Sequence, residues 1–207
     1  MFWDLPGHGL SEKREQPYTL GDCAQALHEL LIAQGMESSI VVGWSMGGSV
    51  FWEYLKRYGT ERIKGFVNVE SLPWADEALF QVDATSQALT KDRQRAMKKF
   101  IQNMFCQKPE PSDLDWMMEE SFKTPLSLAL PLYSEMVASD YRAIAKALKV
   151  PSLSIFGRAG FYRDQVPELE KILPFAQVQW CEKSGHLPFW EESTSFNQLL
   201  QHWVSSL

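Results

Sequence analysis

The chain has 207 residues, of which 45% are hydrophobic, and a formal net charge of −6. A chain of this length and composition can bury a sizeable core as one domain, with room for an inserted subdomain, and intrinsic disorder is excluded. Because no basic cluster exceeds short runs such as Lys98-Lys99, we expect neither nucleic acid nor an anionic membrane as a partner.

The three cysteines, Cys23, Cys106 and Cys181, are far apart and show no C-x-x-C spacing. An odd number in this pattern argues against a disulfide framework and against a zinc site, and favours a reduced, cytoplasmic compartment. No stretch approaches the roughly 20 consecutive apolar residues of a membrane span, and the N-terminus has no charged-then-apolar signal pattern. We therefore expect a soluble cytoplasmic protein.

The first predicted feature is a turn. Residues 4–11, Asp-Leu-Pro-Gly-His-Gly-Leu-Ser, are mostly turn formers and leave little room for a strand before them. Apolar residues at helical spacing then predict a helix with Thr19 as its N-cap, Asp22 three residues later, and Gly35 as its end.

A strand at 39–44 and a helix at 46–58 come next, and between them lies Gly43-Trp44-Ser45-Met46-Gly47, a G-x-S-x-G sequence. A serine hydroxyl is a weak nucleophile unless it is held beside a base, and a strained strand-to-helix turn does this. Glycines leave room for the close backbone approach at such a turn, and the following helix aims free N–H groups at a developing oxyanion. Ser45 is therefore the predicted nucleophile.

The next strand, at 65–69, ends at Glu70, and the order strand, helix, strand predicts a right-handed parallel crossover. From Trp74 to about Asp140 the pattern changes to helices that are rich in Met, Trp and Phe. These predicted helices cover roughly 86–105, 112–122 and 126–139. We interpret residues 74–140 as an inserted helical cap, and residues 1–73 and 141–207 as the core.

Strand and helix then alternate again. The predicted elements are a strand at 152–156, a helix near 165–173, a strand at 176–181 and a helix at 193–205. The fold class is therefore α/β, with a mostly parallel sheet flanked by helices. In such sheets, sites gather outside the carboxyl ends of the strands, where Ser45, Glu70, residues 157–164 and His186 all fall.

His186 lies in Ser184-Gly185-His186-Leu187-Pro188, directly after the last predicted strand. A histidine on this loop can meet Ser45 as a general base, and the alternative interpretation is a surface loop histidine. His28 and His202 lie within predicted helices and are interpreted as ordinary surface or partly buried positions. His8 lies in a glycine-flanked turn that it is expected to shape, the alternative being a place near the site.

With these motifs in place, the chain resembles the α/β-hydrolase fold superfamily, and within it haloperoxidase-like and esterase-like serine hydrolases. Residues 4–11 resemble the turn after that family's fourth strand, residues 43–47 its nucleophile elbow, and residues 184–186 its histidine loop. Their order and spacing cover essentially the whole chain. The resemblance implies a triad in the order Ser, acid, His.

The position of the acid is less obvious. In most members of the family an Asp follows the strand that here ends at Phe156, but Gly160 has no carboxylate. Glu70 is the favoured substitute, because a strand fixes its position and a subset of the family, including many haloperoxidase-like hydrolases, has its acid there. Asp164 is the alternative acid, if its loop folds back, although it could equally cap the following helix. A buried Glu70 needs a partner, and protonated His186 would be one.

The family also has three strands before the turn at residues 4–11, and the loop after the third supplies one of two oxyanion donors. This chain has no counterpart, so only the backbone N–H of Met46 is assigned as a donor. Loss of one donor costs about 10²–10³-fold in rate in serine enzymes. We therefore expect an N-terminally truncated chain, the alternative being a sheet that another segment or a partner completes.

Apolar residues of the predicted cap are interpreted as the lining of an apolar or aromatic acyl pocket, or as plain core. These are Trp74, Phe80, Met97, Phe100, Met104, Trp116, Met117 and Met118. Trp44 either contacts substrate or packs beneath the elbow. The predicted function is a serine hydrolase that cleaves a small or medium carboxylic ester, without a metal or organic cofactor. Two rivals remain: a perhydrolase, haloperoxidase-like enzyme or cofactor-free oxygenase on the same fold, and an inactive interaction protein.

Overall fold

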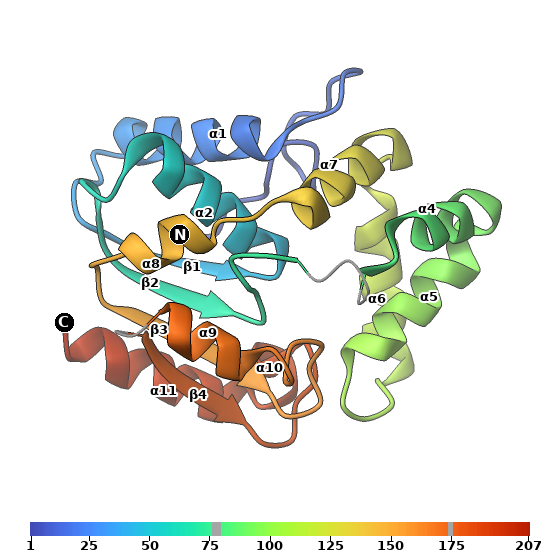
Figure 1. Cartoon of the computed structure of the whole chain (residues 1–207). Coiled ribbons are helices and arrows are strands. Elements are labelled where there is room, and N and C mark those ends of the chain that lie inside the picture. The colour runs from blue at the N-terminus through green and yellow to red at the C-terminus, as the bar shows by residue number, and fades with distance from the viewer. Residues whose placement is uncertain (76–79, 174–175) are drawn as a thin grey trace.

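The computed structural model describes residues 1–75, 80–173 and 176–207 (Figure 1). Up to the end of the second strand the elements are α1 (Leu20–Ala33), β1 (Ser39–Trp44), α2 (Met46–Tyr58) and β2 (Ile63–Val69). The next helices of the described residues are α4 (Val82–Lys91), α5 (Arg93–Met104), α6 (Pro111–Phe122), α7 (Leu126–Ala138) and α8 (Arg142–Ala147). The chain then forms β3 (Ser152–Gly157), α9 (Val166–Ile172), β4 (Ala176–Cys181), α10 (Pro188–Glu191) and α11 (Ser193–Ser205).

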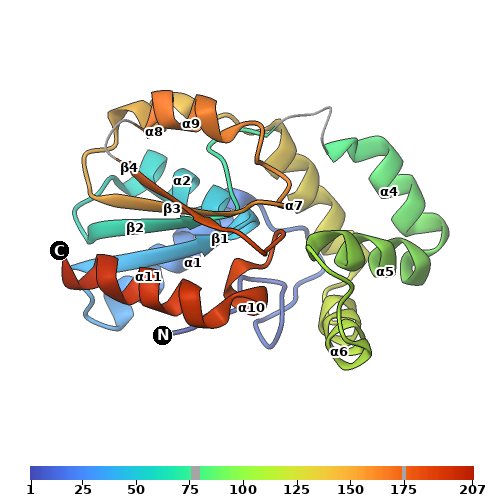
Figure 2. The same ribbon diagram turned by 90° about the horizontal axis from the view of Figure 1, so that it is seen from below.

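The four strands form one parallel sheet in the order β1-β2-β3-β4. Side chains of one strand alternate between the two faces. Phe66 and Phe156 pack with α1, α2 and α9 on one face, whereas Val67 and Ile155 pack with α11 on the other. Figure 2 shows α8 and α9 on one side of the sheet and α11 on the other. The predicted α/β class with a parallel sheet is confirmed.

Helix α1 begins as its sequence predicts. The Thr19 side chain accepts a hydrogen bond from the N–H of Asp22, and the Asp22 carboxylate accepts one from the N–H of Thr19. This capping box satisfies two N–H groups that the first turn of a helix leaves unpaired. The helix ends before Gly35, whose φ of 62° lies in the left-handed region that glycine tolerates.

The predicted helix over 86–105 is wrong in one respect, because the structure has two helices there. The helical conformation is interrupted at Asp92, whose backbone is extended with φ −151°. The Asp92 side chain accepts a hydrogen bond from the N–H of Arg95 and so caps α5. A short acidic side chain competes with the helical backbone in this way, which favours a cap over a helix interior. The short helices α8 and α10 lie outside all the predicted elements.

Helices α4, α5 and α6 lie beyond the sheet, on the side toward which the strands point (Figure 1). The two ends of the predicted cap meet at its base, since Trp74 and Asp140 form an isolated antiparallel bridge and Tyr141 N–H donates to the Pro73 carbonyl. Residues 76–79 of this segment lie outside the described residues. The division into core and cap stays a prediction. Within the described ranges, no helix is long and apolar enough to cross a membrane.

Candidate active site

Ser45 occupies the single position between the end of β1 and the start of α2. Its backbone has φ 51° and ψ −120°, a conformation that costs about 1–3 kcal/mol for a residue other than glycine. The turn is held from both sides, because Ser45 N–H donates to the Val69 carbonyl at 3.0 Å and Gly48 N–H donates to the Ser45 carbonyl at 2.9 Å. Met46 follows as the first residue of α2, where a helix leaves the backbone N–H without an intrahelical acceptor.

The glycines around Ser45 have different roles. A Cβ at Gly43 would lie 2.8 Å from the Gly47 carbonyl oxygen, and a Cβ at Gly48 would overlap the Ser71 hydroxyl. A Cβ at Gly47 would meet nothing within 4 Å among the described residues. Close packing of the turn therefore requires glycine at 43 and 48, and the second glycine of the pentapeptide is free of this constraint.

Glu70 follows β2 and is fully buried. Its carboxylate uses both oxygens: Oε1 accepts a hydrogen bond from Gly157 N–H at 2.7 Å, and Oε2 lies 3.0 Å from His186 Nδ1. Its backbone φ of 44° is also in the left-handed region. A Cβ at Gly160 would overlap the Glu70 carboxylate. The glycine at the position where the family's acid was expected therefore leaves the space that the Glu70 carboxylate fills.

His186 lies in the loop after β4 and is 2% exposed. Because an ionised carboxylate can only accept, Nδ1 is the donor to Glu70, and Nε2 is then the ring nitrogen that can take a proton. The ring stacks on Phe161 with centroids 4.5 Å apart. Trp44 Nε1 donates to the His186 carbonyl at 2.8 Å, so the residue next to Ser45 in the chain is bonded to the histidine loop.

Two protonatable groups near this pair are held neutral. Burial, with a smaller contribution from Glu70, raises the pKa of Tyr162, whose ring centroid lies 6.0 Å from that of His186. Burial also raises the pKa of the Cys181 thiol to about 12, with the charges of Glu192 and Glu70 adding to the effect. A thiol with this pKa is not a competing nucleophile near neutral pH.

Asp164, the alternative acid, lies at the surface. Its side chain is 80% exposed and forms an ion pair with Arg163 at 3.2 Å. It does not cap α9 either, because the N-cap residue of that helix is Gln165. The structure therefore brings Glu70 to His186 and leaves Asp164 at the surface.

Apolar side chains of α5 and α6 pack beside Trp44 and Phe161. This apolar cluster consists of Met97, Ile101, Met104, Phe105, Leu114, Met117, Met118, Leu187 and Phe189 together with those two residues. Four members, Met97, Met104, Met117 and Met118, were interpreted from the sequence as lining of an acyl pocket or as plain core. All four belong to this cluster, against which Trp44, the residue before Ser45, also packs.

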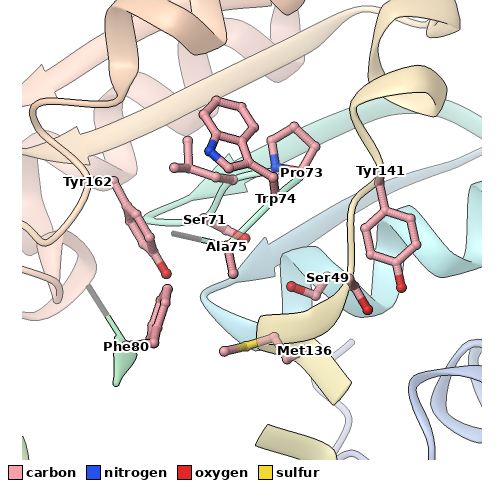
Figure 3. Close-up of a pocket in the computed structure, with 11 residues that line it drawn as sticks. Ser49, Ser71, Pro73, Trp74, Ala75, Phe80, Met136, Tyr141 and Tyr162 are labelled. Atoms are coloured by element: carbon pink, nitrogen blue, oxygen red, sulfur yellow. The ribbon is translucent and has the colours of Figure 1, made fainter. Parts of the chain in front are cut away.

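Trp74 is not in this cluster and lines a small cavity. Figure 3 shows it with Ser49, Ser71 and Tyr162. The cavity that these residues line has a volume of about 10 Å³. A cavity of this size holds about one water molecule. The role of Trp74 in substrate binding stays a prediction.

The sequence patterns did not predict the roles of Phe161 and Glu191. Phe161 lies in the loop over residues 157–164, and its position after the end of a strand could have indicated a place near the site. Glu191, five residues after His186, binds the histidine loop through Gly185 N–H at 2.7 Å. That contact depends on the path of the chain, and the sequence pattern contains no sign of it.

The chain is similar to a known family and to proteins of known name. The family model described as alpha/beta hydrolase fold matches residues 3–112. A pimeloyl-[acyl-carrier protein] methyl ester esterase of Chromobacterium violaceum is 27% identical over 215 residues, which cover 95% of this chain and 80% of that protein.

Solved structures are also similar. An esterase from Exiguobacterium antarcticum superposes with a TM-score of 0.91 at 19% identity, over 98% of this chain and 80% of that one. A bromoperoxidase from Bacillus anthracis superposes with a TM-score of 0.90, also at 19% identity, with the same coverage of both chains. At this identity, each likeness shows the arrangement of helices and strands alone.

Proposed function

Because the chain belongs to the alpha/beta hydrolase fold family, we propose that it is a serine hydrolase that cleaves a small or medium carboxylic ester through an acyl-enzyme. One observation carries the proposal: the buried Glu70 carboxylate lies 3.0 Å from His186 Nδ1, and the His186 carbonyl accepts a hydrogen bond from Trp44, the residue before Ser45. A carboxylate, an imidazole and a serine in this order are the parts of a nucleophilic triad.

In the proposed reaction, Ser45 Oγ attacks the ester carbonyl carbon while His186 Nε2 takes the hydroxyl proton. Glu70 holds Nδ1–H and stabilises the imidazolium that forms. The carbonyl oxygen becomes an oxyanion, to which Met46 N–H donates. As the carbon–oxygen bond to the alcohol breaks, His186 returns the proton to the leaving oxygen. A water molecule then attacks the acyl-serine with the same base, which releases the acid and restores Ser45.

The proposed substrate has an apolar or aromatic acyl group. The methionines of α5 and α6 that pack in the apolar cluster with Trp44 support this assignment, since apolar side chains are what bind such groups. Relatives named for cleavage of a methyl ester support a carboxylic ester as the reacting group. We also propose a reduced, cytoplasmic location, because Cys23, Cys106 and Cys181 are all free thiols.

The test combines an active-site probe with substrate turnover. Wild-type protein should react with a fluorophosphonate and hydrolyse p-nitrophenyl esters, and Ser45→Ala should do neither. Equal labelling of both proteins would contradict the proposal. Peroxide-dependent halogenation or oxygen uptake that exceeds ester hydrolysis would favour the perhydrolase or oxygenase alternative.

A further inference from the structure

Helix α10 begins two residues after His186, and its side chains reach toward α5 and α6. The carboxylate of Glu191, its last residue, binds two segments at once. Oε2 accepts a hydrogen bond from Gly185 N–H at 2.7 Å, and Oε1 accepts from Cys106 N–H at 2.8 Å and from Gln107 N–H at 3.4 Å. Gly185 directly precedes His186, and Cys106 follows the end of α5. One carboxylate therefore joins the histidine loop to the chain beyond α5.

Two further contacts tie the same segments together. His186 N–H donates to the Met104 carbonyl at 2.6 Å. Gly185 packs so closely on that carbonyl that a Cβ would overlap its oxygen. From α10, Trp190 Nε1 donates to Asp113 at 3.0 Å and the indole stacks on Trp116, with centroids 5.5 Å apart. Residues on both sides of His186 are thus bonded to α5, α6 and the chain between them.

We propose that Glu191 is a positioning residue for His186, an inference that rests on the proposed function. It fixes the backbone of the histidine loop against the end of α5, and this keeps the imidazole between the Glu70 carboxylate and Ser45. A displacement of about 1 Å in a reacting group can cost about 10²-fold in rate. Loss of the bridge should therefore act on the chemical step and leave substrate binding largely unchanged.

The neighbouring Glu192 is a matched control, with the same charge and a similar half-buried position. Its Oε2 alone accepts both of its hydrogen bonds, from Lys183 N–H at 2.8 Å and from the Ser184 hydroxyl at 2.7 Å. Glutamine at 192 retains one carbonyl oxygen that can accept both. Glutamine at 191 must turn its NH₂ either toward Gly185 N–H or toward the N–H groups of Cys106 and Gln107, because both carboxylate oxygens are in use.

The experiment compares Glu191→Gln and Glu192→Gln in the full chain. We expect Glu191→Gln to lower kcat on p-nitrophenyl butyrate and the rate of fluorophosphonate labelling by about 10- to 100-fold, with KM within about threefold. Glu192→Gln should stay within about threefold of wild type in each quantity. The downfield proton resonance of His186 Nδ1–H should shift or broaden in Glu191→Gln alone. Equal losses in both variants, or a raised KM with unchanged kcat in Glu191→Gln, would overturn the proposal.

A second variant covers the case in which Glu191→Gln does not fold. Trp190→Phe removes the hydrogen bond to Asp113 and keeps an aromatic ring against Trp116. We expect kcat to fall about threefold or more with KM unchanged, and an unchanged kcat would overturn the proposal. If the wild-type protein neither hydrolyses esters nor takes the probe, the proposed function fails instead. The Nδ1–H resonance then still decides whether Glu191 positions the ring.

Discussion

The two halves of the candidate site are held in place by different means. Ser45 and Glu70 each follow a strand directly, in left-handed backbone conformations fixed by bonds to the next strand: Ser45 N–H to the Val69 carbonyl and Glu70 N–H to the Ile155 carbonyl. His186 lies in a loop, and its position depends on the side chains of Trp44 and Glu191 and on the Met104 carbonyl. Substitutions at the strand ends should therefore disturb the chemistry directly, whereas those around the loop should disturb its alignment.

The largest effect is expected at the acid. Glu70→Gln keeps the volume of the side chain but places an amide where the carboxylate held Nδ1–H, so kcat for p-nitrophenyl ester hydrolysis should fall by about 10⁴-fold. Asp164→Asn, at the exposed alternative, should change it less than about twofold. A large loss in Asp164→Asn with a small one in Glu70→Gln would reverse the assignment of the acid.

A smaller loss is expected from Gly160→Ala. The new methyl group would overlap the Glu70 carboxylate, which must then move away from His186, and kcat should fall by about 10²-fold. The double variant Glu70→Ala with Gly160→Asp tests the same space from the other side, because it returns a carboxylate to the loop after β3. It should recover part of the activity that Glu70→Ala alone loses, and no recovery would show that this loop cannot present an acid to His186.

Near Ser45, substitutions of two glycines should change the free energy of unfolding by different amounts. Gly43→Ala forces a Cβ to 2.8 Å from the Gly47 carbonyl oxygen, and this overpacking should lower the free energy of unfolding by about 1–3 kcal/mol in urea titrations. Gly47→Ala meets no neighbour within 4 Å among the described residues and should change it by less than about 1 kcal/mol. Similar losses in both variants would mean that the tight approach at Gly43 does not limit the turn.

The smallest effect concerns the reactivity of the three thiols. Burial raises the pKa of both Cys23 and Cys181 to about 12, whereas Cys106, beside Glu191, is exposed. Iodoacetamide at pH 8 should therefore alkylate Cys106 in the folded protein and leave the other two unmodified, since the thiolate is the reactive form. Peptide mass spectrometry reads the result. Modification of Cys181 without denaturant would show that the loop after β4 opens in solution.

Local patterns in the sequence were enough for much of this structure. The capping box at Thr19, the strand and helix around Ser45, and the strand that ends at Glu70 are each encoded within a few residues. Because sites in parallel sheets gather outside the carboxyl ends of the strands, the sequence alone also predicted that Ser45, Glu70 and His186 lie at the same end of the sheet. The break at Asp92 was missed because an aspartate within an otherwise helical pattern can face solvent or cap a new helix with the same spacing.

Other parts of the site depend on contacts that sequence spacing cannot encode. The fit of Gly160 against Glu70 joins loops 90 residues apart in the chain, and the bridge through Glu191 joins two more. Trp44 and Trp74 had equal standing as predicted pocket residues. One is bonded to the histidine loop and the other lines a water-sized cavity, a difference that arises only from the path of the chain.

The left-handed backbone at Ser45 and Glu70 bears on how the sequence was selected. Glycine is the residue that this conformation favours, and any other residue there costs about 1–3 kcal/mol. The backbone conformation taken alone would favour glycine at both positions. The chain instead has a hydroxyl and a carboxylate at these two points, so conformational stability is given up there for two side chains of the proposed triad.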